Sequence, residues 1–146
     1  MVKPDIKTRF VASMLRFVGA VKIESEICSE LCGGFNEKEL LIIVFVGENK
    51  NVKMSDIADN LKAPLSTLTS IVDKLVEKQY LARVHSDEDR RVVNVTLMSK
   101  GKTAFKTFQK RKDEMAERVL SQFMGGEQTA FMDYLDKMSA VIESMK

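Results

Sequence analysis

The stretch SDEDRR at residues 86–91 lies between two short runs of β-forming residues. Residues 81–85 read LARVH, and residues 92–97 read VVNVTL, in which apolar and polar residues alternate. This pattern predicts a β-hairpin with a charged tip. Upstream, residues 54–79 predict two short helices joined by a tight turn. Together these segments predict a winged helix, in which the second helix can enter a DNA major groove and the hairpin tip can reach the neighbouring minor groove.

The two helices of this segment have recognisable starts. Ser55 is the expected N-cap of the first helix, and Pro64 is expected to open the second, where a missing N–H costs nothing. At about 100° per residue, the second helix has one apolar face and one polar face, and the polar face is small and hydroxylic over its first two turns. Alone, that face would also suit an ordinary solvated helix. Beside a wing, it predicts a DNA-facing surface made of Ser66, Thr67, Thr69, Ser70 and Lys74.

The segment from about residue 36 to 101 resembles the MarR family of transcriptional regulators. The residues that carry the resemblance are Ser55-Asp56-Ile57-Ala58, Ser66-Thr67-Leu68-Thr69, Asp89-Arg90-Arg91, Val95-Thr96-Leu97 and Gly101. The resemblance implies a mainly helical fold with a small β-hairpin wing. Three positions depart from the family's common residues: Ser70 stands where an arginine is frequent, Pro64 where a hydroxyl cap is usual, and Tyr80 where glycine is common. The operator sequence therefore stays unpredictable.

The resemblance also implies roles for the charged residues of the wing. Arg91 is expected to enter the minor groove, Asp89 to hold Arg91 in a fixed orientation, and Arg90 to contact phosphate. Arg83 is expected either to contact phosphate or to pair with one of the acids at residues 87–89. His85, the only histidine, is expected to be a strand residue near DNA without a catalytic role.

Long amphipathic helices are expected on both sides of the winged-helix lobe. Residues 5–32 predict one helix, which Gly33-Gly34 should end, and residues 100–146 predict two more, the first ended by Gly125-Gly126. Between them, Asn36 and Glu39 predict a capping box for a helix over residues 40–46, although that run is rich in β-formers. We expect a single domain with a lobe at about 36–99. In the MarR family such flanking helices form a homodimer, and the apolar surplus here fits that role.

Composition sets wide limits. The chain has 146 residues, 45% apolar and 30% charged, as in a globular protein. The net charge is +2, and residues 62–102 carry a net +3, which agrees with nucleic-acid binding but does not indicate it alone. No apolar run approaches a membrane span, and no signal-peptide pattern occurs at residues 1–5, so a cytoplasmic protein without a membrane partner is expected.

The two cysteines, Cys28 and Cys32, are four residues apart and should share a helix face. Buried structural thiols are the favoured interpretation, with oxidant sensing as an alternative, and a metal site with Glu24 or Glu30 stays open. The nine methionines should mostly fill the core, although a cleft lined by Met and Phe could admit a small aromatic ligand.

Enzyme motifs are missing from the sequence: it has no glycine-rich phosphate loop, nucleophile elbow or histidine–carboxylate cluster. No cofactor or metal is expected. The sequence therefore predicts a double-stranded DNA-binding regulator, more specifically a homodimeric repressor on a pseudo-palindromic operator, released by a small aromatic effector. The alternatives are a winged-helix module that binds a protein and a cysteine-based redox regulator.

Overall fold

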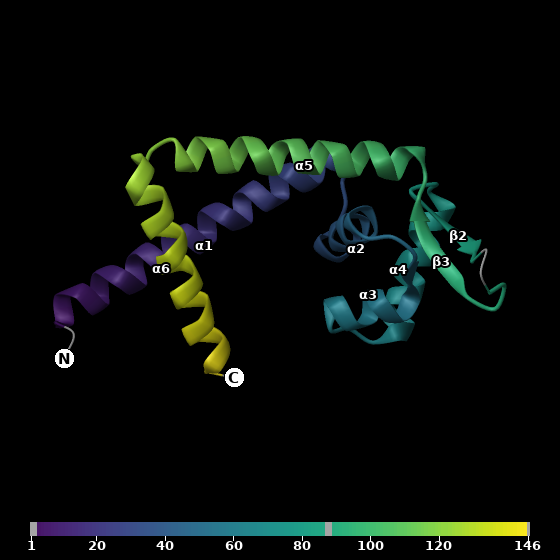
Figure 1. Cartoon of the computed structure of the whole chain (residues 1–146), viewed down its shortest axis with the longest axis horizontal. Coiled ribbons are helices and arrows are strands. Elements are labelled where there is room, and N and C mark those ends of the chain that lie inside the picture. Colours follow the sequence, from purple (N-terminus) through teal and green to yellow (C-terminus); the bar gives the residue numbers. More distant parts are fainter. Residues whose placement is uncertain (1–2, 87–88, 146) are drawn as a thin grey trace. The chain divides into compact units, whose positions relative to one another are not determined.

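The computed structural model describes residues 3–86 and 89–145, which divide into two compact units, Met1–Gln109 and Lys110–Lys146. The described elements follow the order α1–α2–β1–α3–α4–β2–β3–α5–α6 (Figure 1). The bounds are Pro4–Cys32 for α1, Glu37–Glu48 for α2, Val52–Lys53 for β1, Met54–Leu61 for α3, Leu65–Glu77 for α4, Leu81–His85 for β2, Val93–Leu97 for β3, Ser99–Leu120 for α5 and Gly125–Ser144 for α6. The mainly helical fold with a small β wing is confirmed.

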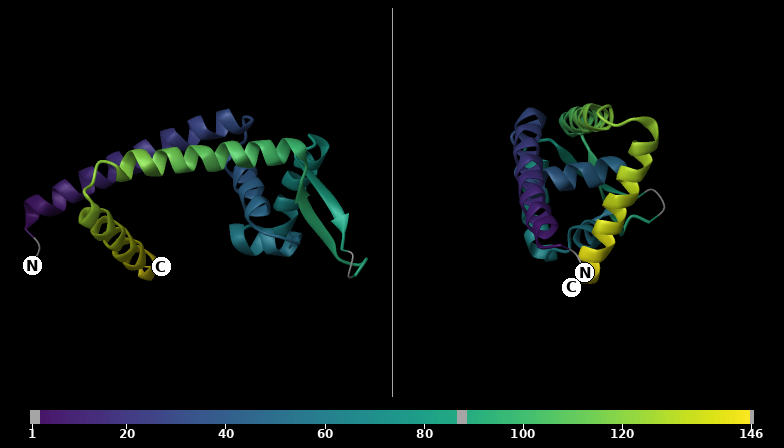
Figure 2. Two further views of the ribbon diagram at one scale, coloured as in Figure 1. Left: turned by 45° about the horizontal axis from the view of Figure 1, so that its top comes forward. Right: turned by 90° about the vertical axis from the view of Figure 1, so that its left-hand side faces the viewer.

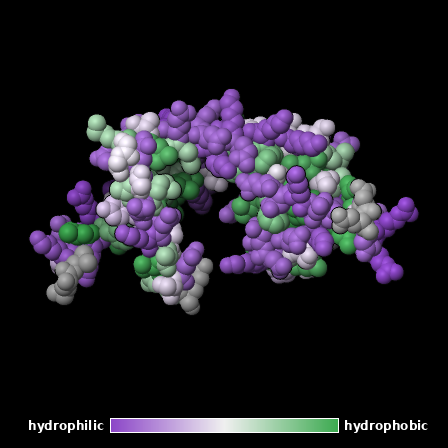
Figure 3. Space-filling view, in the orientation of Figure 1, coloured by the Kyte–Doolittle hydropathy of each residue, from purple (hydrophilic) through white to green (hydrophobic). Residues whose placement is uncertain are grey.

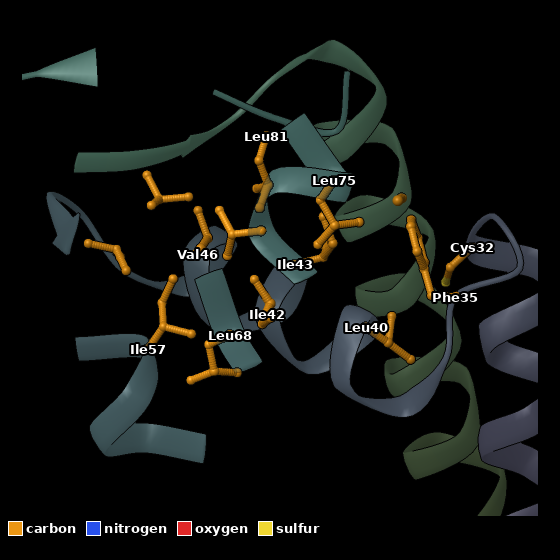
Figure 4. Packing of buried hydrophobic residues seen from close by; sticks show 14 of the residues in the cluster. Cys32, Phe35, Leu40, Ile42, Ile43, Val46, Ile57, Leu68, Leu75 and Leu81 are labelled. Atoms are coloured by element: carbon orange, nitrogen blue, oxygen red, sulfur yellow. The ribbon is translucent and has the colours of Figure 1, made fainter. Parts of the chain in front are cut away.

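The core of the first unit is built around α2. The predicted capping box is present: the Asn36 side chain accepts a hydrogen bond from the Glu39 N–H, and the Glu39 carboxylate accepts one from the Asn36 N–H, each at 2.9 Å. Burial overrides the β-propensity of this run, because Ile42 and Ile43 are completely enclosed (Figure 4). The same cluster holds side chains from every neighbouring element, namely Ile57, Leu68, Val72, Leu75, Leu81, Val95 and Ala104.

The sheet has three antiparallel strands in the order β1-β3-β2. The predicted hairpin is confirmed, with Leu81 paired to Leu97 and His85 to Val93. The two-residue strand β1 was not expected; it pairs Val52 with Val95 on the other side of β3. A strand this short carries no period-2 pattern, so only the partner strand reveals it. The hairpin extends beyond α4 as a projecting wing (Figure 2).

Three predicted helix boundaries were wrong. Ser55 lies inside α3, because the helix begins at Met54 and the Asp56 carboxylate accepts the Lys53 N–H at 2.8 Å. Pro64 is the N-cap of α4 and not its first helical residue. Gly125-Gly126 begin α6 and do not end α5, which stops at Leu120. At the α6 start, the Met124 N–H donates to the Glu127 carboxylate, so a local cap decides the boundary rather than glycine.

The long helices leave apolar side chains exposed. Between Pro4 and Ile27 of α1, every side chain except Met14 and Glu24 is exposed, and only Cys28 and Cys32 near the end are buried. In the second unit, Phe123 and Phe131 stack with ring centroids 4.8 Å apart, yet Tyr134, Val141 and Ile142 of α6 remain exposed. Figure 3 shows hydrophobic surface exposed among the hydrophilic residues.

Candidate nucleic-acid interface

The helix α4 presents opposite faces to the core and to solvent. Leu68, Val72 and Leu75 are completely buried on its inner face. Ser66, Thr67 and Ser70 are exposed on the other side, and Thr69 is half-buried at the margin. The hydroxyls of Thr69 and Ser70 donate to the carbonyls of Leu65 and Ser66, four residues earlier, at 2.8 and 3.2 Å. Their oxygen lone pairs are thereby directed outward, where they could accept hydrogen bonds from a base or a bound water.

Lys74, which was expected to face DNA, forms an ion pair within the protein. Its ammonium lies 2.9 Å from Oε1 of Glu39, a carboxylate that is buried at the start of α2. Burial would raise the pKa of Glu39, but the hydrogen bonds from the Asn36 N–H and from Lys74 outweigh it and hold the pKa below its usual value. Lys74 therefore neutralises a buried acid and ties α4 to α2. No local sequence signal reveals this pair, because its members are far apart in the chain.

Arg83, at the base of the wing, forms an ion pair with Asp73 of α4. Arg83 was expected to contact phosphate or to pair with an acid at residues 87–89. Residues 87 and 88 lie outside the described residues, and among the described residues Asp89 forms no ion pair with Arg83. The pair joins the wing to α4. It also neutralises an acid that would otherwise repel a phosphate backbone near the interface.

The described part of the wing tip is ordered by backbone hydrogen bonds. The Arg91 N–H donates to the Asp89 carboxylate at 2.9 Å, and the Val92 N–H donates to the Asp89 carbonyl at 2.9 Å. His85 Nδ1 lies 2.8 Å from the Arg90 carbonyl oxygen, to which it can donate. Asp89 was expected to orient the guanidinium of Arg91, which stays a prediction; in the structure its carboxylate fixes the backbone at Arg91. The side chains of Arg90 and Arg91 are both exposed.

These elements match a known family. Residues 35–93, from the capping box to the wing, match the model of the MarR family. This segment of the chain belongs to the MarR family. The protein is a winged helix-turn-helix regulator of transcription that binds DNA, in a family that is not enzymatic.

Two curated relatives from Bacillus subtilis (strain 168) are similar to this MarR family protein. YfiV, an uncharacterized HTH-type transcriptional regulator, is 29% identical over 74% of this chain and 68% of its own. MdtR, an HTH-type transcriptional repressor, is 27% identical over 60% of this chain and 57% of its own. Among solved structures, Streptococcus pneumoniae FabT in complex with DNA has the same fold, with a TM-score of 0.76, 23% identity, and coverage of 99% of this chain and 100% of that one.

The cysteines of this MarR family protein lie in its core. Their sulfurs are 3.9 Å apart, both are reduced and buried, and burial together with the neighbouring Cys28 raises the pKa of Cys32 to about 12. A thiol protonated at neutral pH is a poor nucleophile, which favours the structural interpretation. Within residues 3–86 and 89–145, no group of three or more His, Cys, Asp or Glu side chains could hold a metal.

A surface cavity of about 410 Å³ opens in the first unit, beside Cys32. Tyr80 lines it and packs edge-on against Phe35, with ring centroids 4.8 Å apart, while the Lys100 ammonium lies 6.0 Å from the Tyr80 ring centroid. The remaining lining comes from the end of α1 and the first turns of α5: Leu31, Ser99, Thr103, Ala104 and Thr107.

In the described residues, no helix is both long and apolar enough to cross a bilayer.

Proposed function

We propose that this regulator is a cytoplasmic homodimeric repressor that binds a pseudo-palindromic operator, with α4 in the major groove and the wing in the adjacent minor groove. The observation that carries the proposal is the exposed hydroxylic face of α4 beside a wing that exposes Arg90 and Arg91. Small side chains permit a helix to approach base edges closely, and arginine is suited to a narrow, electronegative minor groove.

Two relatives support the finer parts of the proposal. MdtR is a repressor, and FabT was solved in complex with DNA. Under this proposal Ser66, Thr67, Thr69 and Ser70 face bases or backbone, Arg91 enters the minor groove, and Arg90 contacts phosphate. Arg83 and Asp89 contribute by holding the wing in position, and Lys74 contributes by holding α4 on α2.

The apolar surface of α1 supports the homodimer. An exposed helix rich in Ile, Leu, Val and Phe is costly in water unless another surface covers it. A two-fold dimer would present two α4 helices to successive major grooves, about 34 Å apart. The proposed domain organisation follows: a lobe at about 36–99 binds DNA, and the helices over about 5–32 and 100–146 join two copies.

For regulation, we propose release from DNA by a small aromatic effector. The cavity beside Tyr80 supports this, because it offers an aromatic wall, a lysine and hydroxyl groups. An effector bound there lowers DNA affinity only if it prefers a lobe arrangement that mismatches the operator. The competing mechanism is oxidation of Cys28 and Cys32, which their burial disfavours.

Selection of bound duplexes from a random pool tests the DNA-binding mode. We expect a two-fold symmetric site, and an affinity that falls steeply with salt because phosphate contacts release counterions. Enrichment of a single asymmetric half-site would contradict the proposed dimeric mode. Weak binding without sequence enrichment would instead favour the protein-interaction alternative.

The effector is tested on the selected duplex with salicylate as the aromatic probe and hydrogen peroxide as the oxidant. We expect salicylate to weaken binding equally in the parent and in the C28S/C32S double variant, and peroxide to affect neither. Release by peroxide in the parent but not in the double variant would show thiol control. Insensitivity of both proteins to salicylate would contradict an effector of this class.

A further inference from the structure

One apolar side chain stands at the leading end of α4. Leu65 is the first residue of the helix and is 52% exposed, whereas Leu68, one turn later, is completely buried. Pro64 before it is also exposed. The tip of the helix proposed to enter DNA is therefore apolar, although a surface position of this kind is more often polar.

The position of Leu65 on the helix separates it from the core. At about 100° per residue, Leu65 lies between the buried stripe and the hydroxylic face. The Thr69 hydroxyl donates to the Leu65 carbonyl at 2.8 Å, so the two residues belong to the same edge of α4. Leu65 is not a member of the hydrophobic cluster that holds Leu68 and Val72.

The leading half of α4 also lacks charge. From Pro64 to Val72 the sequence is PLSTLTSIV, and the first charged residue, Asp73, is paired with Arg83. A guanine presents two acceptors in the major groove that arginine or lysine reads best, and this segment offers neither. The thymine C5-methyl is the apolar group that the major groove displays, and an apolar side chain is its natural partner.

We propose that Leu65 is a specificity-determining residue that contacts the C5-methyl group of a thymine in each operator half-site. The consequence is a preference for A·T pairs under the tip of α4. This inference rests on the proposed insertion of α4 into the major groove. It adds the residue that discriminates and the chemical group that is read.

The test uses the selected duplex, remade with each thymine in turn replaced by deoxyuridine, which lacks only the C5-methyl group. For the parent protein, we expect deoxyuridine at one symmetry-related pair of positions to weaken binding. The loss should be about fourfold for each methyl group removed, because that factor corresponds to the free energy of burying one methyl group. Leu65→Ala should bind the thymine duplex more weakly and lose this sensitivity to deoxyuridine. Equal sensitivity in Leu65→Ala and the parent would overturn the proposal.

Two control variants separate this inference from the proposed function. Leu41 of α2 is an exposed leucine of similar accessibility, at 47%, so Leu41→Ala should keep the parent's deoxyuridine profile. Ser70→Leu should prevent close approach of α4 and strongly weaken specific binding. If Ser70→Leu fails to do so, insertion of α4 itself is wrong; if it does so while no thymine methyl depends on Leu65, only the reading by Leu65 is wrong.

Discussion

At the scale of single residues, Glu39 shows how one side chain serves both a local and a distant function. Locally, it closes the capping box of α2 with Asn36. At a distance, it binds the ammonium of Lys74 and so fixes α4 relative to α2. Because the carboxylate is buried, losing Lys74 would leave a charge with too little solvation. In the proposed binding mode, Lys74 therefore contributes through the position of α4.

Replacing Glu39 with Gln should lower the free energy of unfolding by about 1 kcal/mol, because Gln can keep the cap but loses the charged hydrogen bond. The pKa of Glu39 lies below 4.5 in the folded protein, so its stabilising effect is present above pH 4.5 and is lost as the pH falls through the lowered pKa. Urea unfolding at pH 7 and pH 3 measures the difference. Glu37→Gln, at the exposed start of α2, is the control. A deficit that persists undiminished at pH 3 would contradict the ion-pair explanation.

The two arginines of the wing should separate into different roles. Arg91→Ala should weaken binding by about 1–3 kcal/mol on the selected duplex, and less on a duplex whose minor-groove contact region is G·C-rich. Arg90→Ala should weaken both duplexes alike and reduce the salt dependence by about one phosphate contact. Both residues are exposed, so thermal stability should not change. Identical behaviour of the two variants on both duplexes would refute this division.

At the scale of elements, the first turn of α5 packs against the residue that precedes β2. A Cβ atom at Gly101 would lie 2.2 Å from the Tyr80 carbonyl oxygen, which already accepts the Met98 N–H at 2.9 Å. Glycine is needed here for a close approach of two backbones, and not for an unusual φ. This contact sets where α5 begins relative to the wing.

Gly101→Ala should therefore lower the free energy of unfolding by about 1–3 kcal/mol, although alanine is the better helix former. Gly126→Ala is the matched control, because a Cβ there meets nothing within 4 Å and the position is also helical. That variant should be neutral or slightly stabilising. Chemical denaturation followed by circular dichroism compares them, and a Gly101 variant as stable as the parent would show that the backbones separate at no cost.

Local patterns predicted most elements, and distant partners account for what they missed. The capping box at Asn36 and the alternation around Val95 act within a few residues, so the sequence alone revealed α2 and the hairpin. The Glu39–Lys74 and Arg83–Asp73 pairs join separate elements, and β1 exists only because β3 accepts it. The sequence pattern does not single out Leu65, because an apolar residue in a helix is expected to be buried, whereas Leu65 at the first position of α4 is exposed.

At the scale of the whole molecule, the proposed homodimer would cover the apolar side chains that α1 exposes. The large apolar side chains that α1 exposes are of the kind usually buried: Ile6, Phe10, Val11, Leu15, Phe17, Val18, Val21, Ile23, Ile27 and Leu31. The winged-helix lobe has its own closed core around α2, which does not require these side chains. We therefore expect that the proposed dimer can be disrupted without unfolding the lobe.

Changing Phe10 and Phe17 together to Glu places two charges on one face of α1, since the residues are seven apart. We expect light scattering to give the mass of a monomer near the 16.5 kDa of one chain, against twice that for the parent, with the helical circular dichroism largely retained. Affinity for the full operator should fall by at least tenfold and approach that for a half-site, because each lobe then binds alone. The control is the Arg16→Glu variant, whose substitution lies on another face of α1 and which should remain dimeric. A double variant that stays dimeric, or a monomer that binds the full operator as tightly as the parent, would rule out α1 as the surface that pairs the two lobes.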